Sequence, residues 1–321
     1  MARTIVGVLR GGTQHFDVSL KNGVSILQAL PEDDYDVRDI LIDKTGTWHL
    51  RGVPMDPLRI VSQHDVILNA LCSGIGEDGT VARLLTQAGV PYVGSRPLPT
   101  ALAHNRILAR DVFVAAKILT PQSMTFMGDR LGDVSVFARR VFERFGPPYV
   151  VKPQFSRLSH GLLIAPTIRD LPYAIITVLQ ESGGGLIEEY IPGEEASAGV
   201  IEGFRDEALY ALPPAHTPVP GNDLVIRHDH HRTNALTHHA PSPFSFEEKE
   251  RLIDSARRAH GALGLAHSSR SHFRIRKGRP YLLEVESLPL LNEGALLPVM
   301  LDAVGATRGD YLSHLIERVK S

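Results

Sequence analysis

Residues 281–286 read Tyr281-Leu282-Leu283-Glu284-Val285-Glu286, and this short stretch is the most informative part of the chain. Its apolar residues predict a buried β-strand, in which residues i and i+2 point to the same face. Glu284 and Glu286 therefore project side by side and repel each other unless a cation lies between them. A solvated polar face on an edge strand explains the pair simply. A Mg²⁺ site explains it too, because Mg²⁺ binds through one or two carboxylates plus phosphate oxygens.

The sequence just before this strand favours a hairpin. A basic run from His272 to Arg276 leads into Lys277-Gly278, a typical turn dipeptide, and the acidic strand follows. We therefore expect two antiparallel strands, with His272 close to the two carboxylates.

Composition narrows the class of protein. The chain has 321 residues, of which 43% are hydrophobic and 22% charged, which suits two or three globular domains. Its net charge of -2 gives no reason to expect nucleic acid or an anionic membrane as a partner. Cys72 is the single cysteine, and Met1–Val6 lack the long apolar run of a signal peptide, so we expect a cytoplasmic protein without a membrane span.

The first hundred residues alternate between strand and helix patterns. An apolar run at Thr4–Leu9 leads through a glycine turn into a helical pattern at Val18–Leu30. A second buried strand at Asp65–Leu71 is followed by the glycine-rich loop Gly74–Gly79 and by a helix at Thr80–Ala88. Parallel βα units place their functional loops at the carboxyl ends of the strands, so residues 1–103 are predicted to form a Rossmann-like α/β domain.

The remaining patterns predict two further domains, a central one over residues 104–192 and a C-terminal one over 193–321. The predicted central elements are helices at 98–118, 134–146 and 170–181, and strands at 148–153, 162–165 and 185–191, with a loop at 154–161. The predicted C-terminal elements are strands at 195–202 and 207–212, a mobile, histidine-rich surface loop at 217–243, helices at 245–263 and 310–319, and the hairpin.

Several short motifs, in a fixed order and spacing, carry a resemblance to a known family. They are Leu9-Arg10-Gly11-Gly12, Gly76-Glu77-Asp78-Gly79, Pro91-Tyr92-Val93-Gly94-Ser95, Val151-Lys152-Pro153, Glu188-Glu189-Tyr190-Ile191-Pro192-Gly193 and Leu283-Glu284-Val285. Together they resemble the D-alanine–D-alanine ligases of the ATP-grasp superfamily over nearly the whole chain.

The resemblance implies an α/β, three-domain ATP-grasp fold, with ATP between the central and C-terminal domains and Mg²⁺ on acidic residues of the latter. It also implies ATP-dependent carboxylate–amine ligation. One D-alanine is phosphorylated on its carboxylate, and the amine of a second D-alanine attacks the acyl phosphate. Phosphoryl transfer needs positive charge around the γ-phosphate. A homodimer is a further expectation from the family.

The family's functional positions map onto this sequence residue by residue. Lys152 and Arg106 match the two residues that contact the ATP phosphates, and Glu195 matches the glutamate that holds the ribose. Arg270, Ser159 and His15 are the candidate catalytic residues, and His272, Glu284 and Glu286 the candidate metal ligands. The segment expected to hold the adenine consists of Glu188, Glu189, Tyr190 and Ile191.

Many of these positions depart from the family pattern. His15 stands where the family has a glutamate for the ammonium group of the first substrate, and a histidine offers no permanent negative charge. His272 replaces a metal-binding aspartate and Glu286 a metal-binding asparagine. The other departures are Cys72 and Ser73 for a histidine and a glycine, Arg106 for a lysine, Leu158 for a serine, and Leu290 for a glycine. The loop that in the family carries a lysine–tyrosine pair reads Arg227-His228-Asp229-His230-His231.

Three functions fit this mixture of retained and changed residues. The first is an active ligase of the D-alanine–D-alanine type, weak or altered in substrate. The second is a catalytically silent relative that binds a nucleotide, a metal or a protein partner. The third is a metal-binding module, in which Mn²⁺ or Zn²⁺ suits His272 with Glu284 and Glu286 better than Mg²⁺. A second metal site is conceivable among the histidines of the 217–243 loop, although a solvated loop explains them too: His228, His230, His231, His238 and His239.

Overall fold

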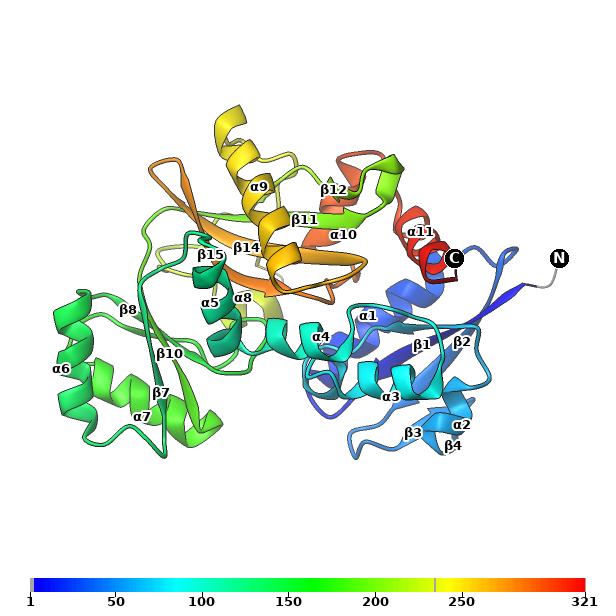
Figure 1. The fold of residues 1–321 in the computed structure, drawn as a ribbon, viewed down its shortest axis with the longest axis horizontal. Helices are drawn as coiled ribbons and strands as arrows, with labels where there is room; N and C mark the ends of the chain where they lie inside the picture. Colours follow the sequence, from blue (N-terminus) through cyan, green and yellow to red (C-terminus); the bar gives the residue numbers. More distant parts are fainter. Residues whose placement is uncertain (1–2, 234, 321) are drawn as a thin grey trace.

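The N-terminal part is an α/β layer built on a largely parallel sheet. In the computed structural model, which describes residues 3–233 and 235–320, the strand order is β4-β3-β2-β1-β5-β6. Figure 1 labels β1 to β4 of this sheet. Strand β1 pairs in parallel with β2 and β5. The strands are β1 (Thr4–Gly11), β2 (Tyr35–Ile42), β3 (Trp48–Leu50), β4 (Val53–Pro54), β5 (Val66–Asn69) and β6 (Tyr92–Val93).

Helices cover both faces of this sheet because its central strands are apolar on both sides. Val6 and Val8 of β1 pack against α1 (Phe16–Ala29) on one face. Leu9 faces the other side, toward α2 (Pro57–Val61) and α3 (Thr80–Ala88). The predicted strands and helices at 4–9, 18–30, 65–71 and 80–88 are confirmed. The antiparallel pairings of β3 with β2 and β4 were not predicted.

The predicted single helix at 98–118 is wrong, because the chain breaks at Asn105. Helix α4 spans Pro97–His104 and α5 spans Arg106–Ala115. Asn105 has an extended backbone, and its side-chain oxygen accepts hydrogen bonds from the amides of Ile107 and Leu108, which is the geometry of a helix N-cap. The break leaves Arg106 as the first residue of a new helix.

The central part is an antiparallel sheet in the order β7-β10-β8-β9. Its strands are β7 (Ser123–Met127), β8 (Tyr149–Pro153), β9 (Leu163–Ala165) and β10 (Gly184–Glu189). Helices α6 (Val134–Arg144) and α7 (Leu171–Ser182) share one core with these strands, and they lie beside the sheet in Figure 1.

The C-terminal part is a second antiparallel sheet, in the order β12-β11-β14-β15, with β13 also paired to β11. The predicted hairpin is confirmed as β14 (Ser268–Arg276) and β15 (Arg279–Glu286), with an irregularity between His272 and Phe273. The remaining elements are β11 (Glu194–Glu202), β12 (Leu209–Ala211), β13 (Ala215–His216), α8 (His228–Arg232), α9 (Phe246–Ala262), α10 (Leu296–Asp302) and α11 (Arg308–Lys320), with short 3-10 turns at Gly74–Gly76 and Phe204–Asp206.

The two ends of the chain meet in one core. Leu312, Leu315 and Ile316 of α11 pack with Val6 and Val8 of β1. Lys320 donates a hydrogen bond to Thr4 through atoms 2.7 Å apart. The N-terminal sheet is therefore covered on one face by residues from the far end of the sequence. No described helix combines the length and hydropathy that a membrane span requires.

Candidate active site

A cleft lies between the central sheet and the C-terminal sheet. Strands β8 and β10 form one wall of a cavity of about 50 Å³, and β11, β14 and β15 form the other. Of the predicted site residues, this cavity is lined by Arg106, Lys152, Ser159, Glu188, Glu189, Tyr190, Ile191, Glu195, His272 and Glu284. The structure thus brings the predicted nucleotide residues together, in a gap too small for a nucleotide unless the two walls part.

Lys152 is the penultimate residue of β8 and lines this cleft. Its Nζ lies 2.6 Å from a carboxylate oxygen of Glu188 on the neighbouring strand β10. Arg110 of α5 contacts the other oxygen of Glu188, so two cations share one carboxylate. Burial lowers the pKa of Lys152 to about 7, since the charged form is poorly solvated there. Lys152 is therefore poised to take up a proton when an anion approaches.

Arg106 reaches the same place from the N-terminus of α5. Its Nη1 donates to the carbonyl oxygen of Pro153, next to Lys152, over 3.2 Å. Its Nη2 lies 3.0 Å from a carboxylate oxygen of Glu284. Arg106 and Lys152 thus converge on one volume, although they come from different elements.

Glu195 is buried, and both of its carboxylate oxygens lie close to basic side chains. Nε of Arg274 donates to one of its oxygens over 2.9 Å, and Nε2 of His272 lies 2.5 Å from the other. Burial disfavours a charged imidazole, but the carboxylates of Glu195 and Glu284 outweigh it and raise the pKa of His272 to about 9. Arg274 also stacks over the ring of Tyr190 and donates to the carbonyl of Ile191, so it orders the predicted adenine segment.

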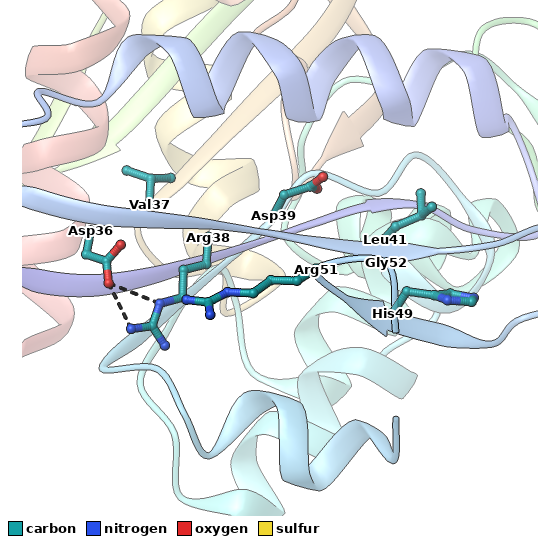
Figure 2. Close-up of a pocket in the computed structure, with 8 residues that line it drawn as sticks. All are labelled: Asp36, Val37, Arg38, Asp39, Leu41, His49, Arg51 and Gly52. Atoms are coloured by element: carbon teal, nitrogen blue, oxygen red, sulfur yellow. Dashed lines mark hydrogen bonds and ion pairs between the residues drawn. The ribbon is translucent and has the colours of Figure 1, made fainter. Parts of the chain in front are cut away.

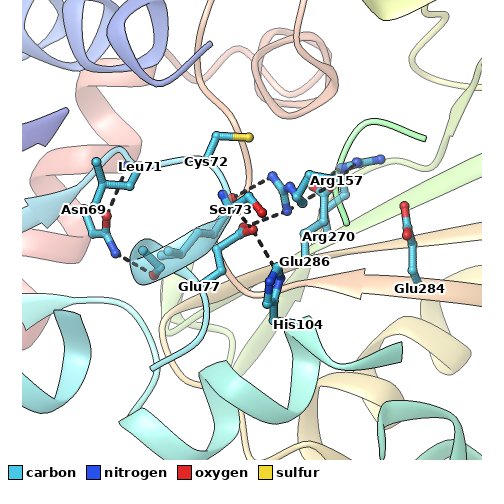
Figure 3. Close-up of polar contacts among 12 residues, drawn as sticks. Asn69, Leu71, Cys72, Ser73, Glu77, His104, Arg157, Arg270, Glu284 and Glu286 are labelled. Carbon is cyan, nitrogen blue, oxygen red and sulfur yellow. Dashed lines mark hydrogen bonds and ion pairs between the residues drawn. The ribbon is translucent and has the colours of Figure 1, made fainter. Parts of the chain in front are cut away.

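A buried ion-pair network links residues 154–161 to the N-terminal and C-terminal parts of the fold (Figure 3). We call residues 154–161 the phosphate loop, because the resemblance aligns the phosphate-binding loop of the ligases with this segment. Arg157 of that loop lies 2.9 Å from Glu77 and 3.5 Å from Glu286, and its Nη2 donates to the carbonyl of Leu288. Nε and Nη2 of Arg270 donate to the two carboxylate oxygens of Glu286, and Nη1 donates to the hydroxyl of Ser197 over 3.0 Å. Burial raises the pKa of Glu77 to about 7, against the opposing effect of Arg157.

The predicted metal ligands lie near one another but are occupied by side chains of the protein. Glu284 is paired with Arg106 and lies 3.8 Å from Nδ1 of His272, and Glu286 is paired with Arg270 and Arg157. Across residues 3–233 and 235–320, no group of three or more His, Cys, Asp or Glu side chains is arranged to hold a metal ion. In this arrangement the set does not fit Mg²⁺, which needs free oxygen ligands in near-octahedral geometry.

A much larger cavity of about 1000 Å³ opens next to the cleft between the two sheets. Ser159, Arg270, His272, Glu284 and Glu286 line it on one side, and α1 lines it on the other. Ser159 has a left-handed backbone with φ of 55°, as has Leu158 with φ of 54°, so the phosphate loop makes a tight turn at this point. The predicted catalytic residues Ser159 and Arg270 thus face a space large enough for two amino acids.

His15 lies apart from this ligand set, in a cluster of three histidines. Its ring centroid is 5.7 Å from that of His160 in the phosphate loop and 6.2 Å from that of His228 at the start of α8. Burial, with the nearby His160, His228 and Arg157, lowers the pKa of His15 to about 4. His15 is therefore a neutral side chain that contacts the loops above the cavity.

The histidine-rich segment is not the open loop that was predicted. It contains α8, and Val225 and Ile226 are buried, because they pack over the cleft that the segment covers. Its histidines scatter to separate partners. His230 pairs with Asp223, His238 with the hydroxyl of Thr217, and the ring of His239 stacks with that of His216.

A separate hollow of about 460 Å³ lies on β2 and β3 of the N-terminal sheet (Figure 2). Arg38 pairs with Asp36, Arg10 with Asp39, and His49 with Asp43 at this edge. The hollow shares no lining residue with the cleft and is therefore separate from the candidate active site.

Comparison with known proteins places this geometry in a family. Residues 116–317 match the family model described as the D-Ala–D-Ala ligase C-terminus. The D-alanine–D-alanine ligase of Geobacter sulfurreducens is 32% identical over 98% of this chain and 93% of its own length. The chain belongs to the D-alanine–D-alanine ligase family. Its predicted α/β, three-domain ATP-grasp fold is confirmed by this membership and by the solved relatives.

Two solved structures show how far the ligase fold is preserved. The D-alanine–D-alanine ligase of Bacillus anthracis, solved in complex with ATP, superposes with a TM-score of 0.82 at 25% identity, covering 99% of this chain and 98% of its own. The VanG D-Ala:D-Ser ligase of Enterococcus faecalis superposes with a TM-score of 0.85 at 21% identity, covering 99% and 100%. The roles of individual residues in this ligase family member stay predictions.

Sequence reasoning missed several residues of the site. Arg110, Arg274 and Ser197 were not singled out, although each contacts a predicted site residue. Glu77 was quoted only as part of a motif, yet it is one of the buried carboxylates that hold Arg157. The Gly76–Gly79 motif marked Glu77 as part of a functional loop. Nothing in the sequence indicated that Arg157 would be its ion-pair partner.

Proposed function

We propose that this protein is an ATP-dependent ligase that joins two amino acids of the D-alanine type through an acyl phosphate. The observation that carries the proposal is the convergence of Lys152 and Arg106 in a cleft between two sheets, in a chain that spans nearly the full length of its ligase relatives. Its adjoining cavity of about 1000 Å³ has room for both amino acids.

The residues present suit each step of that chemistry. A carboxylate oxygen of the first amino acid attacks the γ-phosphorus of ATP and ADP leaves. Arg106 and Lys152 supply positive charge where the phosphoryl group transfers. The amine of the second amino acid then attacks the carbonyl carbon of the acyl phosphate, phosphate leaves, and the amine gives up a proton. Arg270, which faces the large cavity, is placed to steady the developing negative charge.

The test is ADP and dipeptide formation from ATP and D-alanine, measured by a coupled assay and by mass spectrometry. Each reaction is run with Mg²⁺ and with EDTA, and with other D-amino acids in place of D-alanine. We expect turnover that a Lys152→Ala variant loses. Turnover no higher than that of Lys152→Ala with every amino acid tried would rule the proposal out.

A silent relative that binds nucleotide is the second candidate, and one observation favours it. The cations at the site, Lys152, Arg106 and Arg270, are each already paired with a carboxylate of the protein. Calorimetry separates the two candidates, since ATP binding without any dipeptide product supports the silent relative.

Metal binding and dimerisation stay predictions. Mg²⁺, Mn²⁺ or Zn²⁺ at His272, Glu284 and Glu286 would have to displace the arginines that now pair with the two glutamates. Elemental analysis of protein purified without a histidine tag tests the metal. Light scattering of the same sample tests the homodimer.

A further inference from the structure

The acidic face of β15 carries its own counter-charges. Glu284 and Glu286 sit two residues apart on the strand, as the sequence predicted. Each carboxylate meets at least one guanidinium group, so the repulsion between them is already relieved without an added cation.

Glu286 has both oxygens engaged. Arg270 forms a bidentate hydrogen-bonded pair with it, and Nη1 of Arg157 lies 3.5 Å from one of the same oxygens. Glu286 and Arg157 are buried, with side chains only 8% and 6% exposed. A planar guanidinium in this geometry matches a carboxylate closely and competes with a metal ion for both of its oxygens.

Glu284 is engaged from two sides as well. Arg106 lies 3.0 Å from one oxygen, and His272 stands 3.8 Å from the other while its second ring nitrogen contacts Glu195. His272 thus links two carboxylates of the cleft. A divalent cation brought to Glu284 would meet the positive charge of Arg106 at close range.

Two of these arginines also have a buried N–H group without a hydrogen-bond acceptor among the described residues. Nε of Arg106 and Nε of Arg157 are buried and have no hydrogen-bond partner among the described residues. A buried donor left unpaired is costly. Arg106 lines the cleft, whereas Arg157 lies outside its lining, so the Nε of Arg106 is the donor that calls for an acceptor there. A phosphate oxygen is an acceptor of the right charge, and arginine is well suited to bind it.

We propose that the cleft binds the phosphate groups of its nucleotide directly through guanidinium groups, with no bridging divalent cation. Arg106 is the central residue. It donates to Glu284 of β15, lines the cleft together with Lys152, and has a buried Nε without a hydrogen-bond partner. This inference rests on the proposed function, which supplies the nucleotide.

The first experiment titrates ATP into the full-length protein by calorimetry, once with EDTA and once with Mg²⁺. We expect dissociation constants that agree within about threefold. Tightening of tenfold or more by Mg²⁺ overturns the inference and leaves nucleotide binding standing. Absence of ATP binding in both buffers overturns the proposed function and the inference with it.

A variant then tests Arg106 itself. Arg106→Gln removes the charge and frees Glu284, so we expect ATP binding in EDTA to weaken at least tenfold and Mg²⁺ to restore part of it. Arg139→Gln, an exposed change on α6, is the matched control and leaves both affinities unchanged. Unaltered ATP affinity of Arg106→Gln in EDTA contradicts the inference.

A third measurement keeps the test independent of how that variant folds. Mn²⁺ alone is titrated into the wild-type protein and into Glu284→Gln, with free Mn²⁺ followed by electron paramagnetic resonance. We expect the two proteins to retain the same amount of Mn²⁺. Mn²⁺ bound by the wild type and lost in Glu284→Gln overturns the inference.

Discussion

At the scale of single residues, the site is a set of carboxylates that each serve two cations. Arg110 and Lys152 share Glu188, and Arg270 and Arg157 share Glu286. Glu195 in the same way contacts both His272 and Arg274. Breaking a buried pair leaves an uncompensated charge in a poorly solvated place, which is far more costly than losing an exposed pair. Substitutions in this network therefore report on both stability and ligand binding.

The lowered pKa of Lys152 predicts proton uptake when ATP binds. At pH 8 a lysine with a pKa of about 7 is mostly neutral, and a nearby phosphate favours its charged form. We expect up to about one proton taken up per ATP bound. Calorimetry in buffers of different ionisation enthalpy measures it. Lys152→Met should abolish the uptake, and equal heats in all buffers for the wild type would contradict the assignment.

Arg157 is predicted to be a major contributor to stability. Arg157→Leu leaves Glu77 and Glu286 buried without this partner, and we expect it to lower the free energy of unfolding by about 3–5 kcal/mol. Chemical denaturation measures the change. Arg139→Gln on the surface should cost less than about 0.5 kcal/mol. A loss below about 1 kcal/mol for Arg157→Leu would show that the network is solvated.

At the scale of elements, the break between α4 and α5 positions the cleft's arginine. Asn105 ends one helix and caps the next, and the amide of Arg106 donates to the carbonyl of Gln154 in the phosphate loop. A continuous helix would have carried the side chain of Arg106 elsewhere. Local capping chemistry at one residue thus decides whether Arg106 and Lys152 meet.

Asn105→Ala is expected to destabilise the protein by about 1 kcal/mol and to weaken ATP binding. The matched control is Asp133→Ala, because Asp133 caps α6 by the same geometry, far from the cleft. Thermal denaturation and calorimetry measure both variants. If Asp133→Ala weakens ATP binding as much as Asn105→Ala does, the effect is general and the positioning role is wrong.

The elements also show what the sequence could and could not predict. The hairpin of His272 and Glu284 was read correctly because alternation and a Lys-Gly turn are local signals. The helix break at Asn105 was missed because helical periodicity continues through it. The pairing of Arg157 with Glu77 and Glu286 was missed for another reason. These residues come from separate parts of the chain, and only the packed fold brings them together.

At the scale of the whole molecule, neutral, partly buried histidines lie where parts of the fold meet. Burial lowers the pKa of four of them to about 4: His15, His104, His231 and His238. In the unfolded chain the same rings titrate near pH 6.5. Between these values the unfolded chain binds more protons, so stability falls as the pH falls.

We therefore expect the melting temperature to drop between pH 6.5 and pH 4.5. Glu77 works in the opposite sense, since its pKa, raised from 4.5 to about 7, makes the folded state bind the extra proton throughout this range. Calorimetric melting across the range tests the balance. His15→Gln should flatten the dependence. A melting temperature that is constant or rises toward acid, and whose pH dependence His15→Gln leaves unchanged, would contradict the lowered histidine pKa values.

Helix α11 completes a face of the N-terminal sheet, and this has a consequence for biosynthesis. During translation, Val6 and Val8 leave the ribosome long before Leu312, Leu315 and Ile316 exist. Until then that side of the sheet is uncovered and prone to associate with other nascent chains or with chaperones. The polypeptide can adopt its mature form only after α11 has been synthesised, so a premature stop before Arg308 should yield an aggregating fragment rather than a smaller working protein.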